Sequence, residues 1–274
     1  MIDRIYIPTL GRHDYQITYN SLSAKWKKIV TMVVQEKEKH LYKYDCKYHV
    51  IGNDVGIAKT RELIYRYAGA QNYIMIDDDL KFIRRNQKYY GLSPNMEKSK
   101  REFLETDFDD MFNEFENKQN DGIVLCGLRN ANLPPTKYQY TDNSGGVYSV
   151  HSINGKLFME IIDSIDFDTF FSCDGMEDLF LNLEILSMGY KIGKFDEFLY
   201  SNPSGEIGGC STYRTKKSIE NSFLNLQKKY FNYIKFDGWK LADYNNISYP
   251  KIKMFWNKLL KDAPNSSSTL SKFI

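Results

Sequence analysis

Short apolar runs alternate with helical patterns along the first 130 residues, and this alternation constrains the fold more than any other feature of the chain. The apolar runs lie at 4–9, 28–35, 47–52, 73–77 and 122–129, and the helical patterns lie at 56–70 and 107–119. Strands that alternate with helices form βαβ units, in which neighbouring strands run parallel in one sheet. The chain is therefore predicted to be an α/β protein with a mostly parallel, Rossmann-like central sheet flanked by helices.

The pattern changes after residue 130, where loop-forming residues precede a second set of elements. A strand followed by a helix is predicted over 146–163, an amphipathic helix over 175–190 and a strand over 191–202. Residues 211–274 contain 12 Lys or Arg against 4 Asp or Glu, which indicates either a polyanionic partner or a solvated helical face. We expect residues 1–210 to form the α/β domain and residues 211–274 to form a basic, mainly helical extension packed on it.

Simple features of the chain disfavour several classes of protein. No signal peptide is visible, and no apolar run approaches the roughly 20 residues that span a bilayer. The four cysteines are widely spaced, without the pairing that is typical of metal sites, and are expected to be reduced thiols. A cytoplasmic protein is therefore expected, with no membrane association and no obligate protein partner.

Three consecutive aspartates, Asp77, Asp78 and Asp79, follow the strand predicted at 73–77. Side chains alternate along a strand, so Asp77 and Asp79 are expected to project together while Asp78 faces the other way. Ligands of open α/β sheets bind at the carboxyl ends of the strands, and adjacent carboxylates repel unless a cation or a proton intervenes. Hard divalent ions commonly use one or two carboxylates together with substrate phosphates. The cluster predicts a metal–diphosphate site, and the alternative is a solvated group of acids at a strand end.

Two later motifs also carry groups that are suited to chemistry. Glu177 and Asp178 stand at the predicted start of a helix, a position that the helix dipole alone favours for acids. A glycine-rich loop then places Gly208 and Gly209 shortly before Arg214. Backbone N–H groups freed by glycine, together with an arginine, suit a phosphate group, although an ordinary turn explains the same residues.

Four of these motifs occur in the order found in one class of enzyme. They are "IPTLGR" (7–12), "GIAKTRE" (56–62), "IDDD" (76–79) and "GMEDLFL" (175–181). Together they make residues 1–210 resemble the GT-A glycosyltransferases, which use nucleotide sugars and carry an Asp-x-Asp motif. The resemblance implies a GT-A fold and a glycosyl-transfer reaction.

The resemblance also implies a role for each matching residue. Nucleotide-sugar binding would fall to Pro8, Thr9, Arg12, Lys59, Arg61, Asp77, Asp78, Gly208 and Gly209. Asp79 would be the principal ligand of Mn²⁺ or Mg²⁺, with Asp77 near the ribose or the metal. Asp178 would be the catalytic base of an inverting reaction, with Glu177 as its substitute or as a binder of the acceptor hydroxyl. Many members complete the metal shell with a late histidine, whereas the last histidine here is His151.

Basic and aromatic residues that follow the aspartates indicate the acceptor. The candidate DNA-binding residues are Lys81, Arg84, Arg85, Lys88, Arg214, Lys216 and Lys217. Positive charge with interleaved aromatics fits a track for a phosphate backbone, although solvated helix faces explain the same residues. The motifs together most resemble the DNA glucosyltransferases of T-even-like bacteriophages, of the β-glucosyl-HMC-α-glucosyltransferase type. That resemblance implies UDP-glucose as donor and glucosylated 5-hydroxymethylcytosine in double-stranded DNA as acceptor, in the cytoplasm of the host cell.

Other functions remain open on the sequence. A GT-A enzyme could act on a glycan or a lipid-linked sugar, although no strong membrane-facing element is visible. A non-catalytic module that binds a nucleotide sugar or DNA would share the same composition. A nucleotidyl-transferring enzyme would share the aspartates, but "PTLGRHD" is a poor phosphate-binding loop after the first strand.

Overall fold

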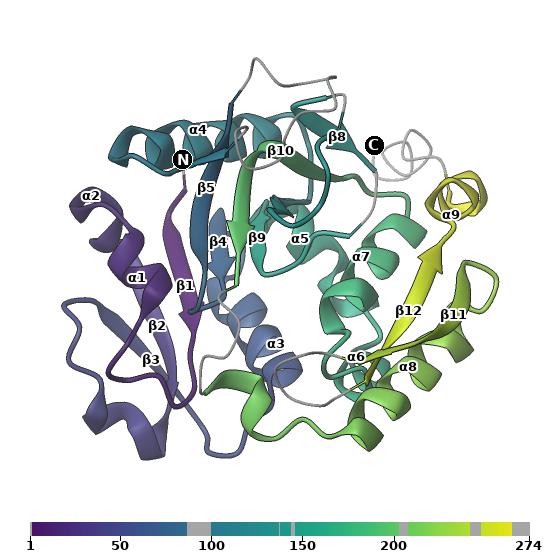
Figure 1. Ribbon diagram of the computed structural model, residues 1–274, viewed down its shortest axis with the longest axis horizontal. Helices are drawn as coiled ribbons and strands as arrows, with labels where there is room; N and C mark the ends of the chain where they lie inside the picture. Colours follow the sequence, from purple (N-terminus) through teal and green to yellow (C-terminus); the bar gives the residue numbers. More distant parts are fainter. Residues whose placement is uncertain are drawn as a thin grey trace.

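The computed structural model describes residues 2–86, 100–136, 138–143, 146–202, 208–241 and 248–264. A ten-stranded sheet runs through the middle of the molecule, with helices on both sides (Figure 1). Its strands are β1 (Arg4–Pro8), β2 (Val30–Gln35), β3 (Lys47–Ile51), β4 (Tyr73–Ile76), β5 (Lys81–Arg85), β6 (Lys100–Glu102), β7 (Leu125–Asn130), β8 (Tyr140–Asp142), β9 (Val150–Ile153) and β10 (Ile192–Ser201).

The α-helices lie between these strands and after them. They are α1 (Ile17–Ser21), α2 (Ala24–Lys27), α3 (Ile57–Ala68), α4 (Glu105–Asn120), α5 (Gly155–Ile161), α6 (Phe167–Ser172), α7 (Glu177–Ser187), α8 (Lys216–Tyr230) and α9 (Trp256–Asp262). Short 3-10 helices occur at η1 (Glu36–Leu41), η3 (Ile162–Ser164) and η4 (Gly209–Thr212). Within the described ranges, no helix is both long enough and apolar enough to cross a membrane.

The strand order of the sheet is β3-β2-β1-β4-β9-β7-β10-β5-β6, and β8 pairs with β10. β1 pairs in parallel with β2 and β4, and β7 pairs in parallel with β10. β9 lies antiparallel between β4 and β7, and β5 is antiparallel to β10. β4 and β7 therefore run in the same direction, and the carboxyl ends of β1, β4, β7 and β10 lie at the same end of the sheet. The predicted α/β fold with a mostly parallel central sheet is confirmed.

Apolar side chains form one core on each face of the sheet. In β4, Tyr73 and Met75 pack into the core shared with α3 and α7, whereas Ile74 and Ile76 pack into the opposite core. This division follows from the alternation of side chains along a strand. The second core is covered by α4, which buries the apolar face that its sequence predicts, Phe108, Met111, Phe112 and Phe115.

The C-terminal extension is helical over α8 and α9, but it also contains a two-stranded sheet that the sequence did not predict. β11 (Ile234–Leu241) and β12 (Ser248–Met254) pair antiparallel, apart from the main sheet (Figure 1). Phe236 and Trp239 of β11 pack on Phe223 of α8, with ring centroids 5.0 and 6.0 Å from that of Phe223. The hairpin thus depends on tertiary contacts with α8, and strand propensity alone does not predict it.

A buried carboxylate joins the extension to the main domain. Glu184 of α7 accepts a hydrogen bond from the Tyr230 hydroxyl and lies 2.8 Å from Lys229 Nζ, and both partners belong to α8. Its second oxygen accepts a hydrogen bond of 3.2 Å from the backbone N–H of Asp166, which caps α6. A carboxylate at this depth is stable only with its partners, because the low dielectric penalises an isolated charge. Glu184 therefore fixes α8 on α7.

Replacement of this carboxylate is expected to loosen the extension. Glu184→Ala leaves the Tyr230 hydroxyl and Lys229 without their shared acceptor, and we expect the free energy of unfolding to fall by about 2–4 kcal/mol. Urea unfolding followed by circular dichroism measures the change. Glu160→Ala, on the exposed surface of α5, is the matched control and should shift stability by less than about 0.5 kcal/mol. Equal effects of the two substitutions would contradict the anchoring role.

Candidate active site

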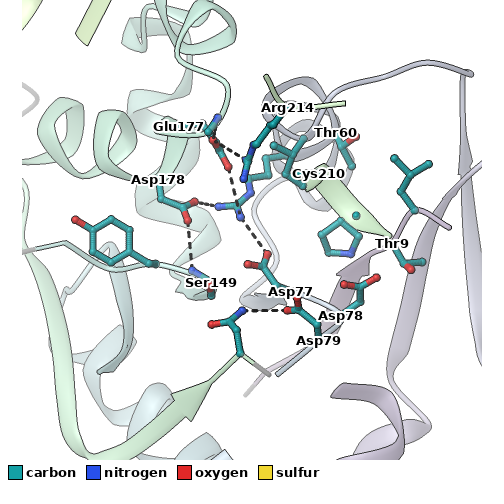
Figure 2. A pocket seen from close by; sticks show the side chains of 18 of the residues that line it. Thr9, Thr60, Asp77, Asp78, Asp79, Ser149, Glu177, Asp178, Cys210 and Arg214 are labelled. Carbon is teal, nitrogen blue, oxygen red and sulfur yellow. Dashed lines mark hydrogen bonds and ion pairs between the residues drawn. The ribbon is translucent and has the colours of Figure 1, made fainter. Parts of the chain in front are cut away.

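A cavity of about 640 Å³ opens at the carboxyl ends of the strands that share a direction. Four of its lining residues follow strand ends, Thr9 after β1, Asp77 after β4, Asn132 after β7 and Asn202 after β10. Residues of α3, of the start of α7 and of the loop before α8 also line it (Figure 2). This is the end of the sheet where α/β proteins bind their ligands.

The three aspartates all line this cavity, so the prediction that Asp78 faces elsewhere is wrong. β4 ends at Ile76, and the aspartates lie in the turn that follows, where strand alternation no longer applies. Asp78 is the most buried of the three and forms an ion pair with Arg12. Burial raises the pKa of Asp78 to about 7, although Arg12 opposes the shift. Asp79 lies 3.2 Å from Arg12 Nη2 and accepts a hydrogen bond of 3.1 Å from the amide of Asn202.

The turn that carries the aspartates is fixed by Thr18 of α1. The Thr18 hydroxyl donates to the Asp77 carbonyl at 2.5 Å and accepts from the Leu80 N–H at 2.9 Å. The Thr18 N–H donates to the Asp78 carbonyl at 3.1 Å, and Leu80 is fully buried. The directions of the three carboxylates are therefore set by a hydrogen-bonded turn with an apolar anchor.

Arg61 of α3 is a buried arginine that joins the two groups of acids. Its Nη2 lies 3.0 Å from Asp77 Oδ1, and the other terminal nitrogen forms an ion pair with Asp178. Glu177 Oε1 lies 3.7 Å from the same guanidinium. Burial raises the pKa of Asp77, with Arg61 acting in the opposite direction. Because Arg61 is only 3% exposed, its charge is shared among these carboxylates with little screening by water.

Glu177 and Asp178 are held differently, although they are neighbours at the start of α7. Glu177 Oε2 accepts a hydrogen bond of 2.6 Å from the Gly175 N–H, and the side chain is 5% exposed. Asp178 is 15% exposed, and its Oδ2 accepts a long hydrogen bond of 3.4 Å from the Ser149 N–H. The Asp178 carboxylate is consequently more accessible from the cavity than the Glu177 carboxylate.

Two residues of the site were not singled out for this role by the sequence. His151 Nε2 lies 3.3 Å from Asp178 Oδ1, and burial, helped by Arg61, holds the pKa of His151 well below its ordinary value. Ser149 adopts a φ of 58°, a left-handed conformation that is uncommon for residues other than glycine. Its carbonyl accepts a hydrogen bond of 2.9 Å from the Asp77 N–H, so Ser149 lies between the two acid groups. No local sequence signal marks the position of Ser149.

The glycine loop packs against the end of β1. Gly208 and Gly209 have φ values of 109° and 61°, and a Cβ on Gly208 would lie 2.7 Å from Arg12 Cγ. The Gly209 N–H donates to the Leu10 carbonyl at 2.8 Å, and Arg12 Nη2 lies 3.4 Å from the Gly208 carbonyl. Both glycines line the cavity. Their conformation allows the close approach that positions Arg12 against the aspartates.

Other residues predicted for the nucleotide sugar or for DNA lie in different surroundings. Pro8, Thr9 and Arg12 line the cavity, whereas Lys59 lies outside the lining and pairs with Glu62 at 2.6 Å. Arg214, predicted to contact DNA, also lines the cavity, 3.7 Å from Asp174 and 3.8 Å from Glu177.

Arg84 and Arg85 are not available to a DNA backbone, which corrects the prediction for both. They belong to β5, where the Arg85 side chain is fully buried and its Nε donates to the Asp196 carbonyl at 3.0 Å. The Arg84 side chain is 14% exposed and stacks on Phe198, with Glu197, Asp110 and Asp107 within 3.6 Å. The remaining candidates are the exposed Lys81, Lys216 and Lys217, together with Lys88, which lies outside the described residues.

The fold and the cavity together define an α/β enzyme with an acidic ligand site at its strand ends. The family model for TET-Associated Glycosyltransferases (TAGT) matches residues 4–205, about three quarters of the chain, and the chain belongs to this family. The protein is therefore a glycosyltransferase. A search of curated proteins found no match. Among solved structures, the inositol-1-phosphate CTP transferase from T. maritima is similar over 83% of this chain and 97% of that chain, with 13% identity and a TM-score of 0.38.

Removal of the Arg61 charge is expected to destabilise the fold. Arg61→Met leaves Asp77 and Asp178 without their shared cation and leaves Glu177 with Arg214 alone, and we expect the free energy of unfolding to fall by about 3–5 kcal/mol. Arg66→Met, on the exposed face of the same helix, is the control, with an expected loss of less than about 1 kcal/mol. Both are measured by urea unfolding.

A double variant separates charge from packing at this site. Arg61→Met combined with Asp178→Asn should be more stable than Arg61→Met alone, because one unpaired negative charge is removed with it. An Arg61→Met protein as stable as the Arg66→Met control would contradict the central electrostatic role of Arg61.

Proposed function

We propose that the protein transfers glucose from UDP-glucose to a modified cytosine in DNA, with glucosylated 5-hydroxymethylcytosine as the acceptor. The observation that carries the proposal is the placement of Asp178 and the Asp77–Asp79 cluster on either side of Arg61 within one cavity. Glycosyl transfer needs a site for the diphosphate leaving group and a base for the acceptor hydroxyl. The Asp77–Asp79 cluster would provide the site for the diphosphate, and Asp178 would provide the base.

The aspartate side of the cavity fits a divalent cation. Five carboxylates and three guanidiniums line the cavity, a formal charge of −2, which repels a nucleotide diphosphate unless a cation neutralises it. Asp78 Oδ2 is buried without a hydrogen-bond partner among the described residues, and Asp79 lies beside the amide of Asn202. In the described ranges, no group of three or more His, Cys, Asp or Glu suits a metal. With so few protein ligands, Mn²⁺ or Mg²⁺ would be held jointly by the aspartates and the diphosphate, and the cation would neutralise the charge of the diphosphate as that group leaves the sugar.

The end of the cavity near β1 suits the nucleotide. Apolar side chains of Val33, Ile51 and Val55 line it together with Pro8 and Thr9. An apolar slot with a few polar groups at its edge is a common form of nucleotide-base site. Arg12 follows Thr9 in the sequence by three residues and contacts Asp78 and Asp79. It therefore connects the β1 end of the cavity with the aspartates.

Asp178 is the residue best placed to act as the base. In the proposed step, an acceptor hydroxyl oxygen bonds to the anomeric carbon while the bond from that carbon to the diphosphate breaks, and Asp178 Oδ2 takes the hydroxyl proton. Arg61 forms an ion pair with Asp178, and burial lowers the pKa of the neighbouring His151, so that the neutral imidazole adds no competing charge. Glu177 is engaged with the Gly175 N–H, which suits it to hold the start of α7 in place. This arrangement supports an inverting reaction.

The acceptor assignment rests on the family and on the chemistry of the cavity rim. The family name associates these glycosyltransferases with TET, and a modified cytosine is the acceptor that this association favours. Tyr148, Tyr213 and Tyr249 line the cavity, and aromatic rings of this kind stack on bases and sugars.

A transfer assay tests the proposed function. The protein is incubated with Mn²⁺, a panel of radiolabelled UDP-sugars, and DNA that contains cytosine, 5-hydroxymethylcytosine or its glucosylated form. We expect label from UDP-glucose to enter only the DNA with glucosylated hydroxymethylcytosine. Label only in the DNA with 5-hydroxymethylcytosine would show that the acceptor is the base before it is glucosylated. Release of UDP without label in any DNA would overturn the DNA acceptor and favour a glycan or a lipid-linked sugar.

Loss of the Asp178 carboxylate should affect the chemical step more than donor binding. Asp178→Asn is expected to lower kcat about 10²- to 10⁴-fold, since the amide cannot accept the proton, with little change in affinity for UDP-glucose. Glu177→Gln should lower kcat less. Asp168→Asn, an exposed acid of α6, is the matched control and should behave as the wild type. A kcat of Asp178→Asn within a few-fold of the control would refute the base assignment.

The metal assignment has a test that does not depend on activity. In the presence of UDP, Asp79→Asn should weaken Mn²⁺ binding by about tenfold or more, because a carboxylate ligand is lost. Electron paramagnetic resonance of free Mn²⁺ measures the affinity directly. Equal Mn²⁺ affinity in Asp79→Asn and in the Asp168→Asn control would show that Asp79 is not a ligand.

A further inference from the structure

Most of the exposed positive charge near the cavity lies on the β11–β12 hairpin, whereas the segment that follows the aspartates has Lys81 as its exposed cation among the described residues. Arg84 and Arg85 of that segment are paired with carboxylates and largely buried. On the hairpin, Lys240, Lys251 and Lys253 are exposed, and no carboxylate of the described residues lies within ion-pairing distance of them. The hairpin therefore offers cations that pair with no carboxylate of the described residues, and of these Lys253 lies 5.8 Å from the centroid of the Phe255 ring.

The lysines of the hairpin share one face. Tyr249, Lys251 and Lys253 alternate along β12 and project to the same side. Across the ladder, Lys240 lies opposite Tyr249, and Lys235 lies opposite Lys253. We name Lys235, Lys240, Lys251 and Lys253 the lysine face. Tyr249 lines the cavity, as does Ile252 from the other side of β12, so the hairpin borders the candidate active site and the Tyr249 end of the lysine face lies at its wall.

The opposite side of the hairpin fixes its orientation. Phe236 lies opposite Ile252 in the ladder and packs on Phe223 of α8, together with Trp239. Glu184 in turn holds α8 on α7, and the first turn of α7 carries the proposed base. The lysine face is thus held at a defined position relative to Asp178.

The lysine face also includes an arrangement that opposes folding. Lys235 and Lys253 are directly opposite each other on neighbouring strands, and like charges in that position destabilise a strand pair. An ion pair of 3.4 Å between Lys235 and Asp237 offsets part of this repulsion. Asp237 is the single acid of the described β11 and β12 residues. A polyanion bound across the face would relieve the repulsion.

We propose that the lysine face binds the phosphate backbone of the acceptor DNA and thereby brings the modified base to the cavity past Tyr249. This inference rests on the proposed function, since it takes DNA as the acceptor. The family model ends at residue 205, before α8 and the hairpin, so this surface belongs to a part of the chain that the model does not match. DNA is the occupant that the charge favours, because a row of lysines without carboxylates complements closely spaced phosphates and reads no sequence.

Two variants with the same net charge test the lysine face. The first is Lys240→Gln/Lys251→Gln/Lys253→Gln, and the second is Lys28→Gln/Lys43→Gln/Lys47→Gln, whose exposed lysines lie near β2 and β3 at the far edge of the sheet. Binding to a fluorescent duplex is measured by anisotropy over a range of salt concentrations. Each lost phosphate contact lowers the salt slope by about 0.9, so the hairpin variant should lose a slope of up to ~2.7 and bind roughly 10- to 100-fold more weakly at 0.1 M salt. The control should bind as the wild type.

Kinetics and stability distinguish a DNA-binding surface from a structural one. The hairpin variant should show a raised KM for DNA, an unchanged kcat and unchanged UDP release in the absence of DNA. Its melting temperature should be equal to or above that of the wild type, because the Lys235–Lys253 repulsion is removed.

Each contrary result has a defined meaning. Equal DNA binding and equal KM in both variants, with transfer to DNA intact, would overturn the lysine face and leave the proposed function standing. If the wild type neither binds DNA nor transfers label to it, the DNA acceptor and the lysine face fail together. Hairpin-dependent binding to anionic phospholipid vesicles without binding to duplex DNA would replace DNA by a membrane surface.

Discussion

The buried guanidinium of Arg61 is the interaction on which the site depends. It lies between the carboxylate that follows β4 and the two carboxylates that begin α7, elements separated by about a hundred residues of sequence. Without this cation, carboxylates would face each other in a poorly solvated space, and mutual repulsion would separate α7 from the strand ends. The close spacing of the proposed diphosphate site and the proposed proton acceptor is therefore a consequence of one α3 side chain. The proposed function couples stability to catalysis there, because the charge that holds α7 at the strand ends also pairs with the proposed base.

Arg12 has a different role, although it also pairs with aspartates. Arg61 is enclosed, whereas Arg12 is attached to a loop whose position depends on the close contact with Gly208. Asp78 and Asp79, which Arg12 contacts, belong to the aspartate cluster that would hold the proposed cation. A divalent ion and a guanidinium would compete for the same oxygens. Donor binding would then require Arg12 to change partners, and the phosphates that arrive with the cation are the partners it prefers.

Much of the site could be predicted because its residues follow elements with strong periodicity. The carboxyl ends of β1 and β4 were located to within one residue from local patterns, and so was the presence of Glu177 and Asp178 at the start of α7. The direction of the Asp78 side chain was not predicted. The strand stops at Ile76, so the alternation of side chains that the prediction assumed does not extend to the aspartates. Arg85 was misplaced for a non-local reason, since its partner Asp196 is on a strand 111 residues away. A basic segment that forms a sheet strand cannot be distinguished from a basic surface segment until that pairing is known.

The position of the extension gives α7 a double function. Its first turn holds Glu177 and Asp178, and two turns later Glu184 holds α8, on which the hairpin packs. The proposed base and the proposed DNA surface are thus attached to the same helix, so the geometry between them does not depend on a flexible linker. An enzyme that reads no sequence must still place one hydroxyl within bonding distance of the donor, and preorganisation of this kind supplies that precision. On this proposal the DNA backbone contact and the proton acceptor are positioned by the same packed helices, and the proposed donor site lies across Arg61 from Asp178.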